Sequence, residues 1–392
     1  MTENSLWEKE QEMRRTCMLM ITHKCNLNCS YCYEGFKSDK QMDFDTAIAA
    51  IKKEAKKTLR SKKVKGLEID LMGGEPMLNF DLIKKLVEWA EEGNIEAPYI
   101  FSMTTNGTLF GEKEKKWFQK HKSSIVCGCS FDGDSSKQEE NRGKESKNID
   151  LDFFCNTWKN QPLHMTISKE SLEGMAEAII SAYDNGYQIE ASLAEGVDWN
   201  DEDSKIYKKE LENLSEHYLK NPKAKPLNIL LRYLNVVNPK KDRKKIQKFC
   251  GAGTYMATYD IDGKTYGCHM FSPIVLGERA IETKNVKFRC SETVADETCN
   301  LCVLKHFCPT CAGFNYKYRN NLGIRDKRKC AMHLQEAIVS ANFQLKLIAQ
   351  RKNKLNTEDA QYAKQALKAI EIIQKVKNKN KYPYRIESEV VK

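Results

Sequence analysis

The sequence predicts an α/β fold built around a parallel sheet, and two observations support this prediction. Short apolar runs alternate with segments of helical periodicity between residues 17 and 219. Polar turns that contain glycine, such as Gly73-Gly74-Glu75 and Asp132-Gly133, directly follow some of these runs. Strands that alternate with helices form βαβ units, in which the strands are parallel and the loops at their carboxyl ends carry function.

Six apolar runs have the length of buried strands and are bounded by turn-forming residues. The predicted strands cover residues 17–21, 67–72, 99–104, 124–131, 163–167 and 189–193. The segments that follow them have helical periodicity; Ile48, Ile51 and Ala55, for example, fall on one face of the first. The predicted helices cover residues 43–60, 81–92, 112–121, 149–159, 170–185 and 202–219.

The pattern changes after these six units. Residues 222–245 are rich in proline and lysine, and we interpret them as a linker with one apolar strand at 229–233. A β-hairpin is predicted around Asp262-Gly263, with arms at 256–261 and 264–266. Amphipathic, lysine-rich helices are expected at 335–351 and 358–377, followed by a polar tail.

Composition narrows the class of protein. The 392 residues carry a formal net charge of +10. The sequence has no basic motif interleaved with aromatic residues, which is typical of a nucleic-acid-binding protein, so we assign most of this charge to solvated helix faces. A weaker alternative is attraction for an acidic peptide. No apolar stretch could span a membrane and no secretory signal is present, so we expect a soluble cytoplasmic protein without a membrane partner.

Fifteen cysteines are many for a chain in a reducing compartment, where they are better interpreted as metal ligands than as disulfides. Four isolated ones are interpreted as small core residues: Cys17, Cys127, Cys129 and Cys155. The others fall in an early and a late group.

The early group is Cys25, Cys29 and Cys32, at C-x3-C-x2-C spacing on the loop after the first strand. Thiolates suit iron–sulfur clusters and zinc. Three thiolates on a cubane leave one iron open, and an open iron can hold a small chelating molecule. The alternative is a structural or zinc site with three thiols.

This triad resembles the signature of the radical SAM superfamily, and the resemblance extends over nearly the whole chain. It implies a partial (β/α)6 TIM-like barrel and a [4Fe–4S] cluster whose open iron binds S-adenosylmethionine (SAM). An electron from a flavodoxin- or ferredoxin-type donor then cleaves SAM to a 5′-deoxyadenosyl radical, which abstracts a hydrogen atom.

The same resemblance implies a SAM-binding set. Its members are Tyr31, Gly73, Gly74, Glu75, Ser130, Arg142 and Leu193. The two glycines allow backbone carbonyls to approach a ligand closely, and Glu75 can accept from the SAM ammonium group. Arg142 would pair with the SAM carboxylate, with a surface salt bridge as the alternative role. Tyr31 and Leu193 would contact the adenine, although Leu193 is equally well explained as a core residue.

The late cysteines resemble the SPASM domain, the extension of radical SAM enzymes that act on ribosomally made peptides and proteins. The pattern comprises Cys250, Cys268, Cys299, Cys302, Cys308, Cys311 and Cys330, with one departure: two residues separate Cys308 from Cys311, where the family has three.

The SPASM resemblance implies two auxiliary [4Fe–4S] clusters, hence three clusters in all. The distal cluster would be bound by Cys299, Cys302, Cys308 and Cys330. The proximal cluster would be bound by Cys250, Cys268 and Cys311, with either Cys290 as fourth ligand or an open iron that could bind a substrate thiolate. A zinc ribbon is the alternative for this spacing.

The resulting domain prediction divides the chain into five parts: 1–16 as an N-terminal segment, 17–225 as the radical SAM barrel, 226–248 as a linker, 249–333 as the SPASM domain and 334–392 as C-terminal helices and tail. The N-terminal segment is too short for the winged-helix leader-binding domain of many relatives. The leader of the precursor peptide is therefore expected to bind a separate recognition protein, or the barrel mouth and SPASM face.

The function predicted on this basis is a peptide maturase that installs a thioether or carbon–carbon crosslink. A formylglycine-forming enzyme of the anaerobic sulfatase-maturing branch is an alternative. In that branch an aspartate follows the second SPASM cysteine, whereas this chain has His269 there, which remains a candidate base or a structural histidine. A non-enzymatic zinc- or peptide-binding protein is the alternative from a different class.

Overall fold

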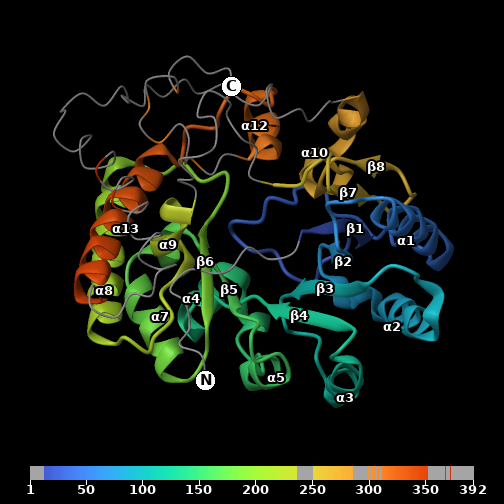
Figure 1. Ribbon diagram of the computed structural model, residues 1–392, viewed down its shortest axis with the longest axis horizontal. Helices are drawn as coiled ribbons and strands as arrows, with labels where there is room; N and C mark the ends of the chain where they lie inside the picture. The colour runs from blue at the N-terminus through green and yellow to red at the C-terminus, as the bar shows by residue number, and fades with distance from the viewer. Residues whose placement is uncertain are drawn as a thin grey trace. The chain divides into compact units, whose positions relative to one another are not determined.

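The computed structural model describes residues 13–235, 250–285 and 311–351, together with the single residues 299, 302, 304, 308, 367 and 371 (Figure 1). The chain forms two compact units. One comprises residues 9–197 and 249–289, and the other comprises residues 1–8, 198–248 and 290–392. The predicted division into five domains remains a prediction.

A parallel sheet forms the centre of the first unit. The strands are β1 (Arg14–Thr22), β2 (Gly66–Gly73), β3 (Tyr99–Thr105), β4 (Ile125–Cys129), β5 (Leu163–Ile167) and β6 (Ile189–Leu193). The first four pair in the order β4-β3-β2-β1, β5 pairs with β6, and a bridge between Ser130 and His164 connects β4 with β5. All six predicted strands are thus present, and they are parallel and adjacent in chain order, which confirms the predicted fold class.

Helices connect these strands. They are α1 (Phe44–Leu59), α2 (Phe80–Trp89), α3 (Glu112–His121), α4 (Ser135–Arg142), α5 (Leu151–Thr157), α6 (Lys169–Leu172) and α7 (Met175–Asp184). Helix α1 begins where the Asp43 side chain accepts from the backbone of Thr46, and it buries Ala47, Ile51 and Ala55. The predicted helix at 170–185 is divided into α6 and α7 at Gly174, which has a positive φ of 74°. The short helix α4 was not predicted, because it is too short to show a periodic pattern.

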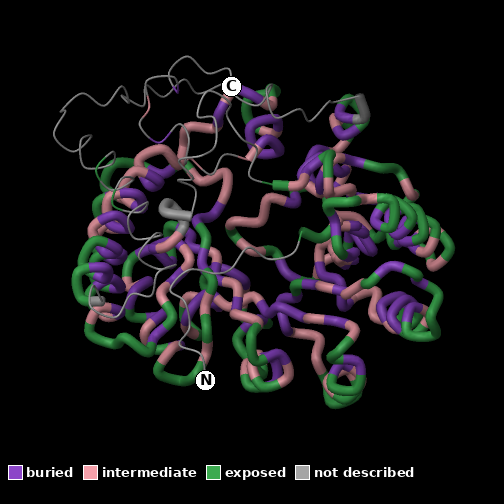
Figure 2. Tube along the Cα trace, viewed as in Figure 1, coloured by how far each residue is buried: buried purple, intermediate pink, exposed green. Residues whose placement is uncertain are grey.

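The two faces of the sheet differ in chemistry. Alternate residues such as Leu19, Ile69 and Phe101 are fully buried in the core shared with the helices, and in Figure 2 the strands are largely purple. The intervening residues of β2 and β3 include Glu68, Asp70 and Ser102, so the other face carries polar side chains at these strands.

The predicted hairpin is confirmed as β7 (Met256–Tyr259) and β8 (Thr265–Tyr266), which are antiparallel. Strand β7 also pairs in parallel with β1 (Figure 1). In this pairing Thr258 lies opposite Met18. Short helical segments follow: His269–Phe271, α10 (Pro273–Leu276) and Gly277–Asn285. The hairpin is therefore an edge of the same sheet, which extends in the order β4-β3-β2-β1-β7-β8.

The second unit is helical in its described part. It contains α8 (Asp201–Lys220), α9 (Asn228–Asn235), α12 (Ala312–Arg319) and α13 (Cys330–Arg351). Helix α13 packs on α8, where Tyr207 Oη donates to Glu336 at 2.8 Å, and on α9, where Ser340 Oγ donates to the Leu230 carbonyl at 2.6 Å. No described helix is apolar over a length that would cross a bilayer.

One element prediction was wrong and one lies outside the described residues. The expected strand at 229–233 is helix α9, because a short apolar run fits either element and packing on α13 decides between them. The helix expected at 335–351 is confirmed and begins earlier, at Cys330. The helix expected at 358–377 is outside the described residues except for Leu367 and Glu371, which are both helical.

Candidate functional site

The three early cysteines lie together on the loop that follows β1. The backbone NH of Cys32 donates to the Cys29 carbonyl at 3.1 Å, and Leu27 NH donates to Cys25 Sγ at 3.5 Å. Burial raises the pKa of Cys29 to about 11, with smaller increases from Cys32 and Cys25. The three thiols are therefore close enough for their charges to interact.

This donor set fits an iron–sulfur cluster. The three cysteines are partly buried and lie on one loop of eight residues. Thiolates of cysteines are the ligands that iron–sulfur clusters use. The loop therefore offers three ligands of the kind that such a cluster needs.

The turn after β2 packs directly against the cysteine loop. Gly74 NH donates to the Thr22 carbonyl at 3.1 Å, and Glu75 NH donates to the Lys24 carbonyl at 2.8 Å. A Cβ atom at Gly74 would lie 2.4 Å from the Lys24 carbonyl oxygen and 2.8 Å from Cys25 Cβ. Glycine is required here by the close approach of two backbones, independently of any ligand.

Glu75 is buried and its carboxylate is held by the end of β3. Its Oε1 accepts from Thr105 Oγ1 at 2.7 Å and from Met77 NH at 3.1 Å, and its Oε2 accepts from Asn106 NH at 2.8 Å. Burial raises the pKa of Glu75, and these three donors lower it. Asn106 in turn donates to Asn26 on the cysteine loop at 2.9 Å. Thr105 and Asn106 were not among the predicted site residues; their position at the carboxyl end of a predicted strand was the available signal.

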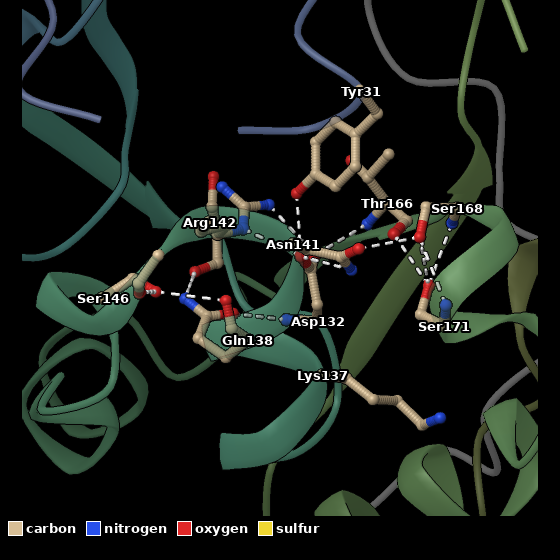
Figure 3. A network of polar contacts seen from close by, with 12 residues as sticks. Tyr31, Asp132, Lys137, Gln138, Asn141, Arg142, Ser146, Thr166, Ser168 and Ser171 are labelled. Carbon is tan, nitrogen blue, oxygen red and sulfur yellow. Dashed lines mark hydrogen bonds and ion pairs between the residues drawn. The ribbon is translucent and has the colours of Figure 1, made fainter. Parts of the chain in front are cut away.

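Arg142, at the end of α4, is buried and engages Asp132 through two nitrogens (Figure 3). Asp132 also accepts from Tyr31 Oη at 2.8 Å, so these side chains meet where the loops after β1 and β4 come together. Asp132 was not among the predicted site residues, although the Asp132-Gly133 turn follows a predicted strand.

Two other predicted residues lie at carboxyl ends of strands. Ser130 follows β4, and its NH donates to the Thr105 carbonyl at 2.9 Å. Leu193 is buried as the last residue of β6, opposite Ile167. The assignment of both to SAM binding remains a prediction.

His269 lies beside the cysteine loop. Its Nε2 is 3.3 Å from Tyr33 Oη, and its Nδ1 is buried without a hydrogen-bond partner in the described structure. Burial lowers the pKa of His269 to about 4, so the ring is neutral at physiological pH. Cys268 is buried next to it and Cys250 is exposed, both in the first unit.

The other late cysteines belong to the second unit. Burial raises the pKa of Cys308 to about 11, and Cys302 and Cys299 add to this increase. Burial also raises the pKa of Cys330, and the largest other increases come from Cys308, Cys299 and Cys302. The four cysteines predicted to bind the distal cluster thus lie in the same unit, where Cys302 NH donates to the Cys299 carbonyl at 3.1 Å. Cys311 precedes α12, and Cys290 is outside the described residues.

Comparison with known protein families and sequences gives two kinds of match. Residues 13–151 match the model of the 4Fe-4S single cluster domain. The chain is 37% identical over 116 residues to an uncharacterized protein of Methanocaldococcus jannaschii, covering 30% of this chain and 38% of that protein. It is 28% identical over 163 residues to the radical SAM cyclopropyl synthase TigE of Paramaledivibacter caminithermalis, covering 38% of this chain and 32% of that protein.

Solved structures match over a greater length. The chain is 16% identical to anSMEcpe with bound AdoMet and Cp18Cys peptide, with a TM-score of 0.62, over 88% of this chain and 100% of that one. It is 17% identical to SuiB of Streptococcus suis bound to precursor peptide SuiA, with a TM-score of 0.51, over 81% and 76% of the two chains. At these identities the likeness concerns the fold.

The chain spans less than two-fifths of the length of each of these two curated relatives. The region that matches the 4Fe-4S single cluster domain includes the cysteine loop. Together with the parallel sheet and the thiol geometry, the matches confirm the predicted resemblance. Residues 13–151 thus match the 4Fe-4S single cluster domain, and the chain is similar in sequence to a radical SAM enzyme and in fold to a structure solved with bound AdoMet.

Proposed function

We propose that this protein is a radical SAM enzyme that forms a thioether or carbon–carbon crosslink in a ribosomally made peptide. The main observation behind the proposal is a contact between two turns at the carboxyl edge of the sheet. The Gly73-Gly74-Glu75 turn is hydrogen-bonded to, and packs closely against, the loop that carries Cys25, Cys29 and Cys32. When bound, the cluster and SAM together supply a 5′-deoxyadenosyl radical that takes a hydrogen atom from the substrate.

The residues of the chain would bind and orient these groups. The three thiols would hold the cluster, and the close backbone approach at Gly74 keeps their loop in place. Glu75 and Arg142 offer opposite charges for the SAM ammonium and carboxylate groups, while Ser130, Tyr31 and Leu193 would complete the pocket. A dry site is needed, because a primary carbon radical attacks most neighbouring groups.

We further propose two auxiliary clusters. The distal one is supported by the spacing of Cys299, Cys302, Cys308 and Cys330 and by their position in one unit. Cys250, Cys268 and Cys311, with Cys290 or an open iron, would form the proximal one. These clusters would accept the second electron of the reaction or bind a substrate thiol.

A peptide substrate is supported by the fold. Two proteins with this fold have been solved with peptides bound, anSMEcpe with Cp18Cys peptide and SuiB with precursor peptide SuiA. The net charge of +10 favours an acidic leader segment. We place the protein in the cytoplasm, where a reducing environment keeps its fifteen cysteines available as ligands and a flavodoxin or ferredoxin can supply electrons.

Anaerobic reconstitution with iron and sulfide tests this proposal. Three cubanes predict about twelve irons per chain, and SAM cleavage to 5′-deoxyadenosine should require a low-potential reductant. With the precursor peptide, mass spectrometry should detect the loss of two hydrogen atoms. A protein that contains zinc and does not cleave SAM would contradict the proposal and favour a binding protein.

A further inference from the structure

Asp132 is a fully buried carboxylate at the carboxyl end of β4 that accepts five hydrogen bonds (Figure 3). The donors are Tyr31 Oη at 2.8 Å, Arg142 Nε and Nη2 at 3.0 Å each, Asn141 Nδ2 at 3.1 Å and Thr166 NH at 3.2 Å. A buried charge is stable only when it is paired and fully hydrogen-bonded, and Asp132 meets both conditions.

These contacts join three parts of the fold. Tyr31 belongs to the cysteine loop, Arg142 to α4, and Thr166 to β5. The cysteine loop is also fixed to α4 by a hydrogen bond from Ser30 NH to the Asn141 carbonyl at 2.8 Å. Removal of the Asp132 carboxylate would therefore release Tyr31 and Arg142 together.

The two-point contact with Asp132 also fixes the orientation of Arg142. A bidentate guanidinium–carboxylate pair is planar and directional, and the Arg142 guanidinium carbon lies 5.4 Å from the centre of the Tyr31 ring. The remaining nitrogen, Nη1, has no hydrogen-bond acceptor in the described part of the chain. Arg142 can thus present one nitrogen to a further anion while Asp132 holds the other two.

The charges of this pair act on the cysteine loop with opposite signs. Ser30, the neighbour of Cys29, is hydrogen-bonded to Asn141, the neighbour of Arg142, and Arg142 is paired with Asp132, so both charges lie close to the cysteine loop. The negative charge of Asp132 therefore offsets the positive charge of Arg142 close to thiols that are proposed to bind iron.

We propose that Asp132 is a positioning residue for the cluster and SAM site, which orients Arg142 and Tyr31 and offsets the positive charge of Arg142 beside Cys29. This inference rests on the proposed function. It predicts an effect on the reduction potential of the cluster, because the reduced cluster carries one more negative charge. A nearby positive charge stabilises the reduced form and raises the potential, and a nearby negative charge lowers it.

A double-mutant cycle gives opposite expectations for the two members of the pair. Asp132→Asn removes the negative charge with little change in shape and should raise the potential. Arg142→Gln removes the positive charge and should lower it. The double variant should return towards the wild-type value, because both charges are gone.

The potentials are measured by redox titration of anaerobically reconstituted protein, followed by electron paramagnetic resonance. The relevant cluster is the one whose signal changes when S-adenosylmethionine is added. Asp134→Asn is the matched control: Asp134 is two residues away and accepts only from the backbone of Ser136 and Lys137, so a much smaller shift is expected. A purely structural role would not give shifts of opposite sign.

The outcomes separate this inference from the function on which it rests. Opposite shifts that cancel in the double variant support it, and if Asp132→Asn fails to assemble a cluster, a lowered potential in Arg142→Gln still does. Unchanged potentials, or shifts of the same sign, in protein that still responds to S-adenosylmethionine would overturn this inference alone. A wild-type protein without such a cluster would refute the proposed function as well.

Discussion

Carboxylates near the sheet differ in the number of hydrogen-bond donors around them. Asp132 and Glu75 are buried, with five and three hydrogen-bond donors respectively. Asp70, on the polar face of β2, accepts only from Ser102 Oγ at 3.4 Å and lies near Glu68. Burial, with a further contribution from Glu68, raises the pKa of Asp70 to about 7. The charge of Asp70 therefore changes within the physiological range.

Asp70→Asn should remove a pH dependence of stability. The pKa of Asp70 in the folded chain is above its ordinary value, so the native state holds the proton more tightly and the free energy of unfolding falls as pH rises from about 4 to about 7. The variant, which stays neutral, should be more stable than wild type at pH 8, and this difference in the free energy of unfolding should become smaller at pH 5. Urea unfolding at both pH values measures the difference. A difference that does not depend on pH would show that Asp70 titrates normally.

At the scale of elements, strand register brings the two key turns together. Parallel pairing of β1 with β2 ends at Thr22 opposite Gly73, so the loops that leave both strands begin side by side. The Gly73-Gly74 turn then lies against the backbone of Thr22 and Lys24. The position of the cysteine loop follows from strand pairing together with the absence of side chains at two glycines.

Gly74→Ala should therefore displace the cysteine loop. The added Cβ meets backbone atoms rather than a flexible side chain, so overpacking should lower the free energy of unfolding by about 1–3 kcal/mol and reduce the iron retained after reconstitution. The matched control is Gly35→Ala, on the same loop, where a Cβ has nothing within 4 Å. Equal stability and iron content for the two variants would contradict this account of the turn.

At the scale of the whole molecule, the parts that could be predicted are those set by local pattern. The six strands and the cysteine loop follow from short apolar runs and from residue spacing, and the hairpin around Asp262-Gly263 follows from its turn residues. The pairing of β7 with β1 joins residues more than 230 positions apart, for example Met18 with Thr258, and no local pattern encodes it.

The parts that could not be predicted depend on tertiary contacts. Helix α9 was mistaken for a strand because only its packing on α13 distinguishes the two. The family resemblance assigned Arg142 to a ligand, but it could not show that Asp132 engages two of its nitrogens. Hydrogen-bond partners between distant loops are visible only once the fold is known.

The central claim is that the three early thiols hold the cluster that cleaves SAM. The most direct measurement is the release of 5′-deoxyadenosine by the triple variant Cys25→Ala, Cys29→Ala, Cys32→Ala, prepared anaerobically and supplied with S-adenosylmethionine and a strong reductant. The control is Cys155→Ala, which removes an isolated, half-buried cysteine of the same unit. We expect the triple variant to release none and the control to match wild type; continued release by the triple variant would contradict the claim.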